Sequence, residues 1–167
     1  MKDKDMICTQ HDDLVEHAAR WLRKKHAVVI TEIAGGSETP DAIGFQATGH
    51  TTLIECKTSR RDFLTDQKKF FRGYAPGLGM GAKRYYLTPP GLLGVDELPK
   101  NWGLLELRGK RIYTVWDAIH VPKHNKHNEI SILISLIRRI GRNPVDGVSV
   151  RFYTYSTKNK ATAGVEI

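Results

Sequence analysis

The sequence predicts a single domain of the α/β or α+β class, in which helices flank a mixed central β-sheet. Its 167 residues suit one compact domain. The predicted elements follow the order helix, three strands, helix, strand, hairpin, helix, which is typical of helices packed on a sheet. Apolar residues make up 40% of the chain, enough for one core, and we find no internal repeat or dividing linker.

Periodic patterns define the elements in the first half of the chain. Leu14, Ala18 and Leu22 recur at helical spacing, while Asp12 and Asp13 favour a helix start just before them. A β-branched run at 26–33, a short strand candidate at 40–47 and the clearest strand at 51–57 follow, and glycines separate them. The predicted elements are a helix at 11–25, strands at 26–33, 40–47 and 51–57, and a helix at 60–72.

The helix at 60–72 has a recognisable start. Ser59 is a good N-cap, and Asp62 three residues later resembles a capping box with Asp in place of Glu. The helix should end at Gly73. Its predicted apolar stripe consists of Phe63, Leu64, Phe70 and Phe71.

The second half contains a hairpin and a helix. The helix is apolar beyond one stripe, so it is either well buried or a face for a homodimer. We expect a domain core over 12–115, followed by a C-terminal helix and strand within 116–155. In order, the elements are a glycine-rich loop at 73–81, a strand at 84–88, hairpin strands at 102–107 and 111–115, a helix at 128–142, a strand at 148–155 and a polar tail at 156–167.

The charge balance favours a polyanionic partner. Lys and Arg total 26 against 18 for Asp and Glu, which gives a net charge of +8. Nucleic acid is the commonest partner of such chains, although the same charge also serves solubility. The two cysteines fit neither a zinc site nor a disulfide framework, and no apolar segment resembles a signal peptide or membrane span. We therefore expect a cytoplasmic protein.

Asp41, Glu55 and Lys57 form the set with the clearest chemistry. If 40–47 and 51–57 pair as a hairpin, Asp41 meets the end of the second strand. Glu55 and Lys57 are two residues apart, so both point to one face, while Ile54 and Cys56 point to the core. Adjacent carboxylates repel, and a divalent cation relieves that repulsion. Oxygen ligands suit Mg²⁺ or Mn²⁺, which activate water and stabilise charge on phosphate.

The run Pro40-Asp41 followed by Glu55-Cys56-Lys57 resembles the PD-(D/E)XK nuclease superfamily. The stretch from Lys57 to Lys68 is similar to that of its MmcB-like DNA-repair group, and the segments 84–89 and 98–105 resemble later strands of that group and its phage relatives. The resemblance extends over about 12–115 and implies a restriction-endonuclease-like core. It also implies a further catalytic and metal-binding acid from the first helix, for which Glu16 is the best match. Glu38 is the competing candidate.

The helix after Lys57 is basic and is expected to hold the phosphate backbone of DNA. A plain solvated helix face is the alternative. Asp62 and Asp66 match the family stretch and are expected to support Lys57 or the DNA. The residues assigned to DNA are Ser59, Arg60, Arg61, Lys68, Lys69 and Arg72.

These observations predict a magnesium-dependent endonuclease that hydrolyses DNA in repair, recombination or phage DNA metabolism. RNA remains open as a substrate. The alternative is a nucleic-acid-binding or anti-defence module that has lost catalysis on the same fold. A loop with His120, His124 and His127 fits three roles: a metal site, a DNA contact or a solvated loop.

Overall fold

The computed structural model describes residues 2–33 and 38–142. The chain forms two compact units, Met1–Ile132 and Leu133–Ile167, and the first contains every strand described below. The expected strand at 148–155 and the tail at 156–167 lie outside the described residues. The fold is α+β with a six-stranded mixed sheet and flanking helices, which confirms the predicted class. Within the described ranges, no helix has both the length and the apolar character needed to cross a bilayer.

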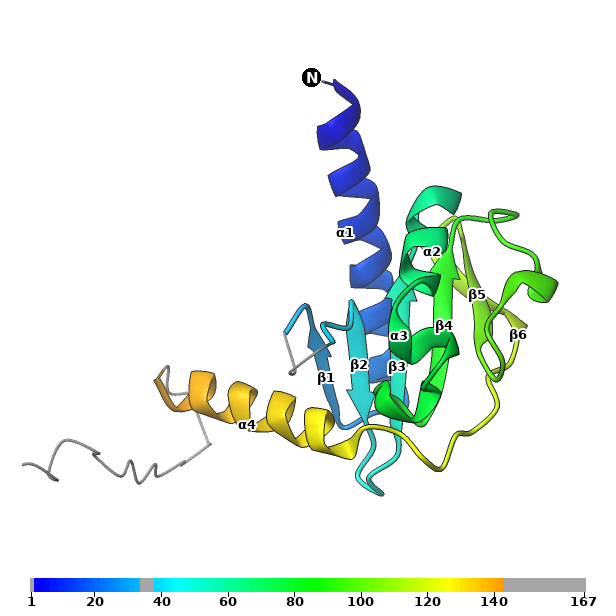
Figure 1. The fold of residues 1–167 in the computed structure, drawn as a ribbon. Helices are drawn as coiled ribbons and strands as arrows, with labels where there is room; N and C mark the ends of the chain where they lie inside the picture. The colour runs from blue at the N-terminus through cyan, green and yellow to red at the C-terminus, as the bar shows by residue number, and fades with distance from the viewer. Residues whose placement is uncertain (1, 34–37, 143–167) are drawn as a thin grey trace, which may run out of the picture. The chain divides into compact units, whose positions relative to one another are not determined.

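The six strands lie in the sheet in the order in which they occur along the chain (Figure 1). Only β3–β4 and β4–β5 are parallel pairs, and the other neighbours are antiparallel. The predicted hairpins are therefore confirmed. The strands are β1 (Val28–Thr31), β2 (Ala42–Phe45), β3 (Thr51–Cys56), β4 (Lys83–Thr88), β5 (Gly103–Arg108) and β6 (Arg111–Trp116).

Helix α1 (Lys2–Arg23) covers one face of the sheet. It begins earlier and ends earlier than the predicted 11–25. Its apolar stripe is buried as expected, with Leu14, Ala18 and Leu22 in one core together with Ile54 and Cys56 of β3. The alternation along β3 therefore places Glu55 and Lys57 on the opposite face.

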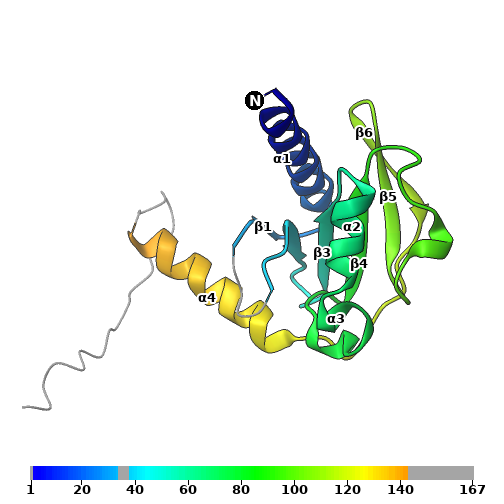
Figure 2. The same cartoon turned by 45° about the horizontal axis from the view of Figure 1, so that its top comes forward.

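Helices α2 (Arg60–Gln67) and α3 (Phe70–Gly73) lie on that opposite face (Figure 2). Phe63 anchors α2, since its ring meets Tyr86 of β4 edge-on at 5.0 Å. Tyr86 in turn stacks on Trp102, which lies just before β5, at 4.5 Å. These aromatic contacts fix α2 above β4, which is the neighbour of the strand that carries Glu55.

The single helix predicted at 60–72 is wrong, because the chain breaks at Lys68 and Lys69. Lys69 is extended (φ −63°, ψ 132°). In a continuous helix Arg72 would lie about 240° around the axis from Asp66. After the break, Arg72 turns back to bind that carboxylate.

The break also changes the predicted apolar stripe. Phe63 is buried, whereas Leu64 is half exposed. Phe70 is 57% exposed and stacks on the ring of Tyr74, which is 88% exposed, at 5.5 Å. Phe70 is thus a surface residue, and the prediction that it packs in the core is wrong.

The glycine-rich segment contains a 3₁₀ turn, η1 (Pro76–Leu78), and leads directly into β4. At Gly81 φ is +85°, and a Cβ there would lie 2.6 Å from that of Leu53. Glu129, near the start of α4 (Lys126–Arg142), accepts hydrogen bonds from the Gly81 amide (2.8 Å) and the Thr51 hydroxyl (2.9 Å). A second 3₁₀ turn, η2 (Val95–Glu97), precedes β5.

Candidate active site

The β2–β3 hairpin brings Asp41 and Glu55 together. Ala42 is paired with Ile54, so the residue before β2 lies opposite the end of β3. The Cys56 amide donates a hydrogen bond of 2.7 Å to Asp41 Oδ2. The backbone of β3 therefore holds the Asp41 carboxylate beside the strand that carries Glu55.

Glu55 is a buried carboxylate between two cations. It is 2% exposed, with Lys57 Nζ 3.3 Å from Oε2 and Arg72 Nη2 3.0 Å from Oε1. Burial raises the pKa of Glu55 to about 7, and the Asp41 charge adds to that rise, while Arg72 and Lys57 oppose it. The charged form of Glu55 is therefore costly in the metal-free protein.

Lys57 is held between two carboxylates. Its Nζ lies 3.3 Å from Glu55 and 3.8 Å from Asp66, and its side chain is 7% exposed. Burial alone would lower the pKa of Lys57, but these carboxylates raise it above its usual range. Lys57 is thus a fixed ammonium group beside the acidic pair.

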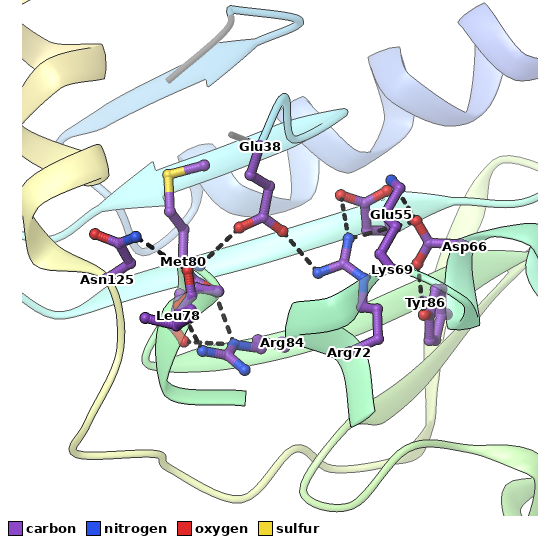
Figure 3. Close-up of polar contacts among 12 residues, drawn as sticks. Glu38, Glu55, Asp66, Lys69, Arg72, Leu78, Met80, Arg84, Tyr86 and Asn125 are labelled. Atoms are coloured by element: carbon purple, nitrogen blue, oxygen red, sulfur yellow. Dashed lines mark hydrogen bonds and ion pairs between the residues drawn. The ribbon is translucent and has the colours of Figure 1, made fainter. Parts of the chain in front are cut away.

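Arg72 joins three carboxylates on this face of the sheet (Figure 3). Its guanidinium lies 2.6 Å from Glu38, 2.8 Å from Asp66 and 3.0 Å from Glu55. It also lies over the Trp102 ring at 4.7 Å. The prediction that Arg72 binds DNA is wrong, because its side chain is 1% exposed and its donors face these acids.

Asp66 is buried beside Lys57, the residue that it is predicted to support. It accepts hydrogen bonds from Arg72 Nε (2.8 Å) and the Tyr86 hydroxyl (2.7 Å), and Lys69 forms an ion pair with it. Burial would raise the pKa of Asp66, but the charge of Arg72 and its hydrogen bond hold it well below its usual range. Asp66 is therefore an ionised anchor beside Lys57.

Glu38 belongs to the same network. One of its oxygens binds Arg72, and the other accepts a 2.7 Å hydrogen bond from the Met80 amide. Glu38 is 3% exposed, and the Arg72 guanidinium that it binds also forms an ion pair with Glu55. Of the two competing acids, the structure thus brings Glu38 toward the site.

Glu16 does not point toward Asp41. Its side chain is 64% exposed and pairs with Arg20 one turn later, which lowers the pKa of Glu16. The reason is helical phase, because residues 14, 15, 18 and 19 of α1 face the sheet. His11 shares that phase, and its Nε2 lies 3.5 Å from Asp41 Oδ2. A hydrogen bond to Asp41 raises the pKa of His11.

His11, Asp12 and Glu32 form a group of possible metal ligands beside Asp41, with their ligand atoms within 4.8 Å of one another. The histidines of the later loop do not form such a group in the described part of the chain. His120 meets the ring of His50 at 5.4 Å. The His124 side chain is 5% exposed and lies 3.5 Å from Glu129.

The residues assigned to DNA on α2 have different environments. Ser59 caps the helix and accepts a hydrogen bond from the Asp62 amide. Arg60 is exposed and forms an ion pair with Glu97, and Arg61 and Lys68 are exposed as well. Lys69 is half exposed, although it pairs with Asp66. Arg60, Arg61, Lys68 and Lys69 thus stay at the surface, whereas Arg72 is buried.

Comparisons with known proteins bear on the fold. No family model matches the chain, and the curated proteins gave no match. A solved structure, that of a protein of unknown function from Silicibacter pomeroyi, is similar, with a TM-score of 0.61 and 23% identity over 84% of this chain and 95% of that one. The two chains share a fold.

Glu55→Gln is expected to stabilise the metal-free protein at pH 8. Folding raises the pKa of Glu55 from 4.5 to about 7, so the wild type loses stability as pH rises through that window. Gln carries no charge and avoids the loss. We expect a gain of about 1–3 kcal/mol at pH 8 that disappears near pH 4.5, measured by guanidinium unfolding with EDTA.

Asp66→Asn is the matched control. Because the folded-state pKa of Asp66 is lowered, its ionised form contributes stability above the unfolded pKa of 3.8. This variant should lose stability at pH 8. If Glu55→Gln is less stable than the wild type at pH 8, the inference that the ionised Glu55 carboxylate destabilises the folded protein is contradicted.

Proposed function

We propose that this protein is a metal-dependent nuclease that hydrolyses phosphodiester bonds in DNA. The observation that carries the proposal is the convergence of Asp41, Glu55 and Lys57 at one end of the β2–β3 hairpin, with Glu55 and Lys57 almost wholly buried. Asp41 and Glu55 would hold Mg²⁺ or Mn²⁺. Lys57 would act on the water or the phosphate.

The donor set fits such a cation. Glu55 Oε1 is buried and makes no hydrogen bond among the described residues, although Arg72 lies within ion-pair distance. Asp41 is 18% exposed, so its carboxylate is open to an ion from solvent. Carboxylate oxygens are the ligands that Mg²⁺ and Mn²⁺ prefer. When bound, such an ion would lower the pKa of a bound water and stabilise negative charge on a phosphate.

The protein groups around the acids hold the reacting parts in place. Lys57 offers N–H donors that orient a water or neutralise charge on a phosphate oxygen. Glu55 and Asp66 fix its position from two sides. Asp66 is itself fixed by Tyr86 and Arg72, so the lysine is positioned before a substrate arrives.

Charge and surface composition favour DNA as the substrate. The net charge is +8, and Arg61 and Lys68 are exposed on the helix that follows Lys57. The exposed Phe70–Tyr74 stack lies just after these cations and offers flat rings to unpaired bases. Cleavage of RNA in place of DNA is an outcome that the test below distinguishes.

A binding module without catalysis is the second candidate. The observation that favours it is that both Glu55 oxygens already face cations, Arg72 and Lys57. The buried charge is thus partly neutralised by the protein alone. Such a module would bind nucleic acid or a host protein without requiring a metal.

The decisive experiment combines metal binding with cleavage. We expect the purified protein to bind Mn²⁺ in calorimetry and to cut DNA with Mg²⁺ or Mn²⁺ but not with EDTA. Asp41→Asn should lose both properties, while Asp96→Asn, at an exposed carboxylate in η2, should keep them. Matched RNA, single-stranded, duplex and branched DNA substrates define the specificity. Nucleic-acid binding with no metal uptake by the wild type would favour the second candidate.

A further inference from the structure

A second cavity lies behind the carboxylate network, between α3, the start of β4 and the turn before β5. Its volume is about 200 Å³. Three of its nine lining residues are cationic and none is acidic. The cations are Arg72, Arg84 and Lys100. This composition favours an anion as the occupant.

Arg84 is the unusual member of this wall. It is 2% exposed, yet no carboxylate of the described residues lies within ion-pair distance of it. Its Nε donates to the carbonyls of Met80 (2.7 Å) and Gly81 (3.0 Å), and its Nη2 donates to that of Gly79 (2.7 Å). Figure 3 shows these bonds on one side of the guanidinium.

Among the described residues, the Nη1 donors of Arg84 have no hydrogen-bond acceptor and can bind a ligand. Nη1 makes no hydrogen bond to the described residues, because the carbonyls of the glycine-rich segment occupy only Nε and Nη2. A guanidinium stays ionised in proteins, so its charge persists in the buried site. Burial lowers the pKa of Arg84 and the charge of Arg72 adds to this effect, while the charges of Glu38 and Glu129 oppose it. Since neither carboxylate forms an ion pair with Arg84, an anion bound directly to the guanidinium would reduce the cost of burying its charge.

Arg72 lines the same cavity, but its charge is already paired with carboxylates. Its donors face Glu38, Asp66 and Glu55 on the side of the candidate active site. The positive charge left in the cavity therefore belongs to Arg84 and, at the exposed rim, to Lys100. Asn101 and Trp102 add further N–H groups to the wall.

We propose that this cavity binds a phosphate-class oxyanion, with Arg84 as the buried ligand and Lys100 at its mouth. A guanidinium fork matches two oxygens of a tetrahedral anion, and the volume is sufficient for one such group. The anion is either free orthophosphate or the terminal phosphomonoester of a nucleic acid. The assignment does not depend on the proposed nuclease activity, since Arg72 separates the cavity from Glu55.

Calorimetry with orthophosphate, in metal-free buffer at constant ionic strength, tests the site. We expect saturable binding to the wild type that chloride does not reproduce. Arg84→Lys should weaken the binding at least tenfold. Lys100→Glu leaves the buried groups intact and places a negative charge at the mouth, so it should also weaken binding tenfold or more. Lys110→Ala, at an exposed lysine in the β5–β6 turn, should bind like the wild type.

A second comparison distinguishes the two sources of the anion. A 5′-phosphorylated oligonucleotide that binds more tightly than its 5′-hydroxyl form, with the difference lost in Lys100→Glu, identifies a nucleic-acid end. Equal binding of the two, together with orthophosphate uptake, identifies the free anion. The proposal is overturned if the wild type takes up no orthophosphate, or if Lys100→Glu binds it as well as Lys110→Ala does. A failed nuclease assay leaves this result unaffected.

Discussion

Lys57→Ala should reduce metal-dependent DNA cleavage by about 10²–10³-fold or more while the affinity for DNA changes only a few-fold. The ammonium lies 3.3 Å from Glu55 and is almost wholly buried, so no neighbouring cation can replace it without movement. Single-turnover cleavage with Mg²⁺ or Mn²⁺ measures the loss. Fluorescence anisotropy with the same DNA measures binding.

Lys69→Ala is the matched control for that experiment. Both lysines contact the same oxygen of Asp66, but the Lys69 side chain is 43% exposed and lies on the solvent side. Its removal should leave the cleavage rate within a few-fold of the wild type. Equal loss in the two variants would show that a general weakening of Asp66 causes the effect. Undiminished cleavage by a folded Lys57→Ala protein would reject the proposed role of Lys57.

Arg72→Met is expected to cause a large loss of stability, about 3–5 kcal/mol at pH 8. The substitution keeps much of the side-chain volume but leaves three buried carboxylates without their shared cation. Since a small domain has a total stability of about 5–15 kcal/mol, the loss should be evident in urea unfolding curves. The deficit should shrink toward pH 5, because the released carboxylates then take up protons.

An exposed arginine gives the comparison. Arg60→Met breaks an ion pair with Glu97 in which the Arg60 side chain is 56% exposed, and its urea unfolding curve should stay close to that of the wild type. Arg72→Lys, which keeps the charge but not the three-way geometry, should lie between the two. Equal stability of Arg72→Met and Arg60→Met would mean that the buried network contributes little.

Features that depend on short-range pattern were predictable from the sequence. The pairing of the 40–47 and 51–57 segments follows from two strands joined by a tight turn, and it places Asp41 beside Glu55. The stripe of α1 follows from the 3.6-residue period, and Leu14, Ala18 and Leu22 are buried as expected. Such local rules predict on which face of a helix or strand a side chain lies. They do not predict which residues far along the chain it contacts.

The residues that the sequence misassigned depend on long-range contacts or on helical phase. Arg72 is 34 residues from its partner Glu38. The sequence around it does not indicate that Arg72 is buried while Lys68 and Lys69 are exposed. Glu16 carries the carboxyl group that the resemblance implies, but residue 16 lies off the buried phase of α1. His11 lies on that phase, so the apolar stripe itself could have indicated it.

The hydrogen bond from the Cys56 amide to Asp41 links the position of this carboxylate to the packing of the core. The Cys56 side chain belongs to the core beneath α1, while its amide positions the Asp41 carboxylate beside Glu55. A change of volume at Leu14 or Ala18 would therefore alter the separation of Asp41 and Glu55. If a variant at one of these core positions folds but is less active, we expect the cause to be a displaced Asp41 carboxylate. Such a variant should bind the proposed metal ion more weakly than the wild type does.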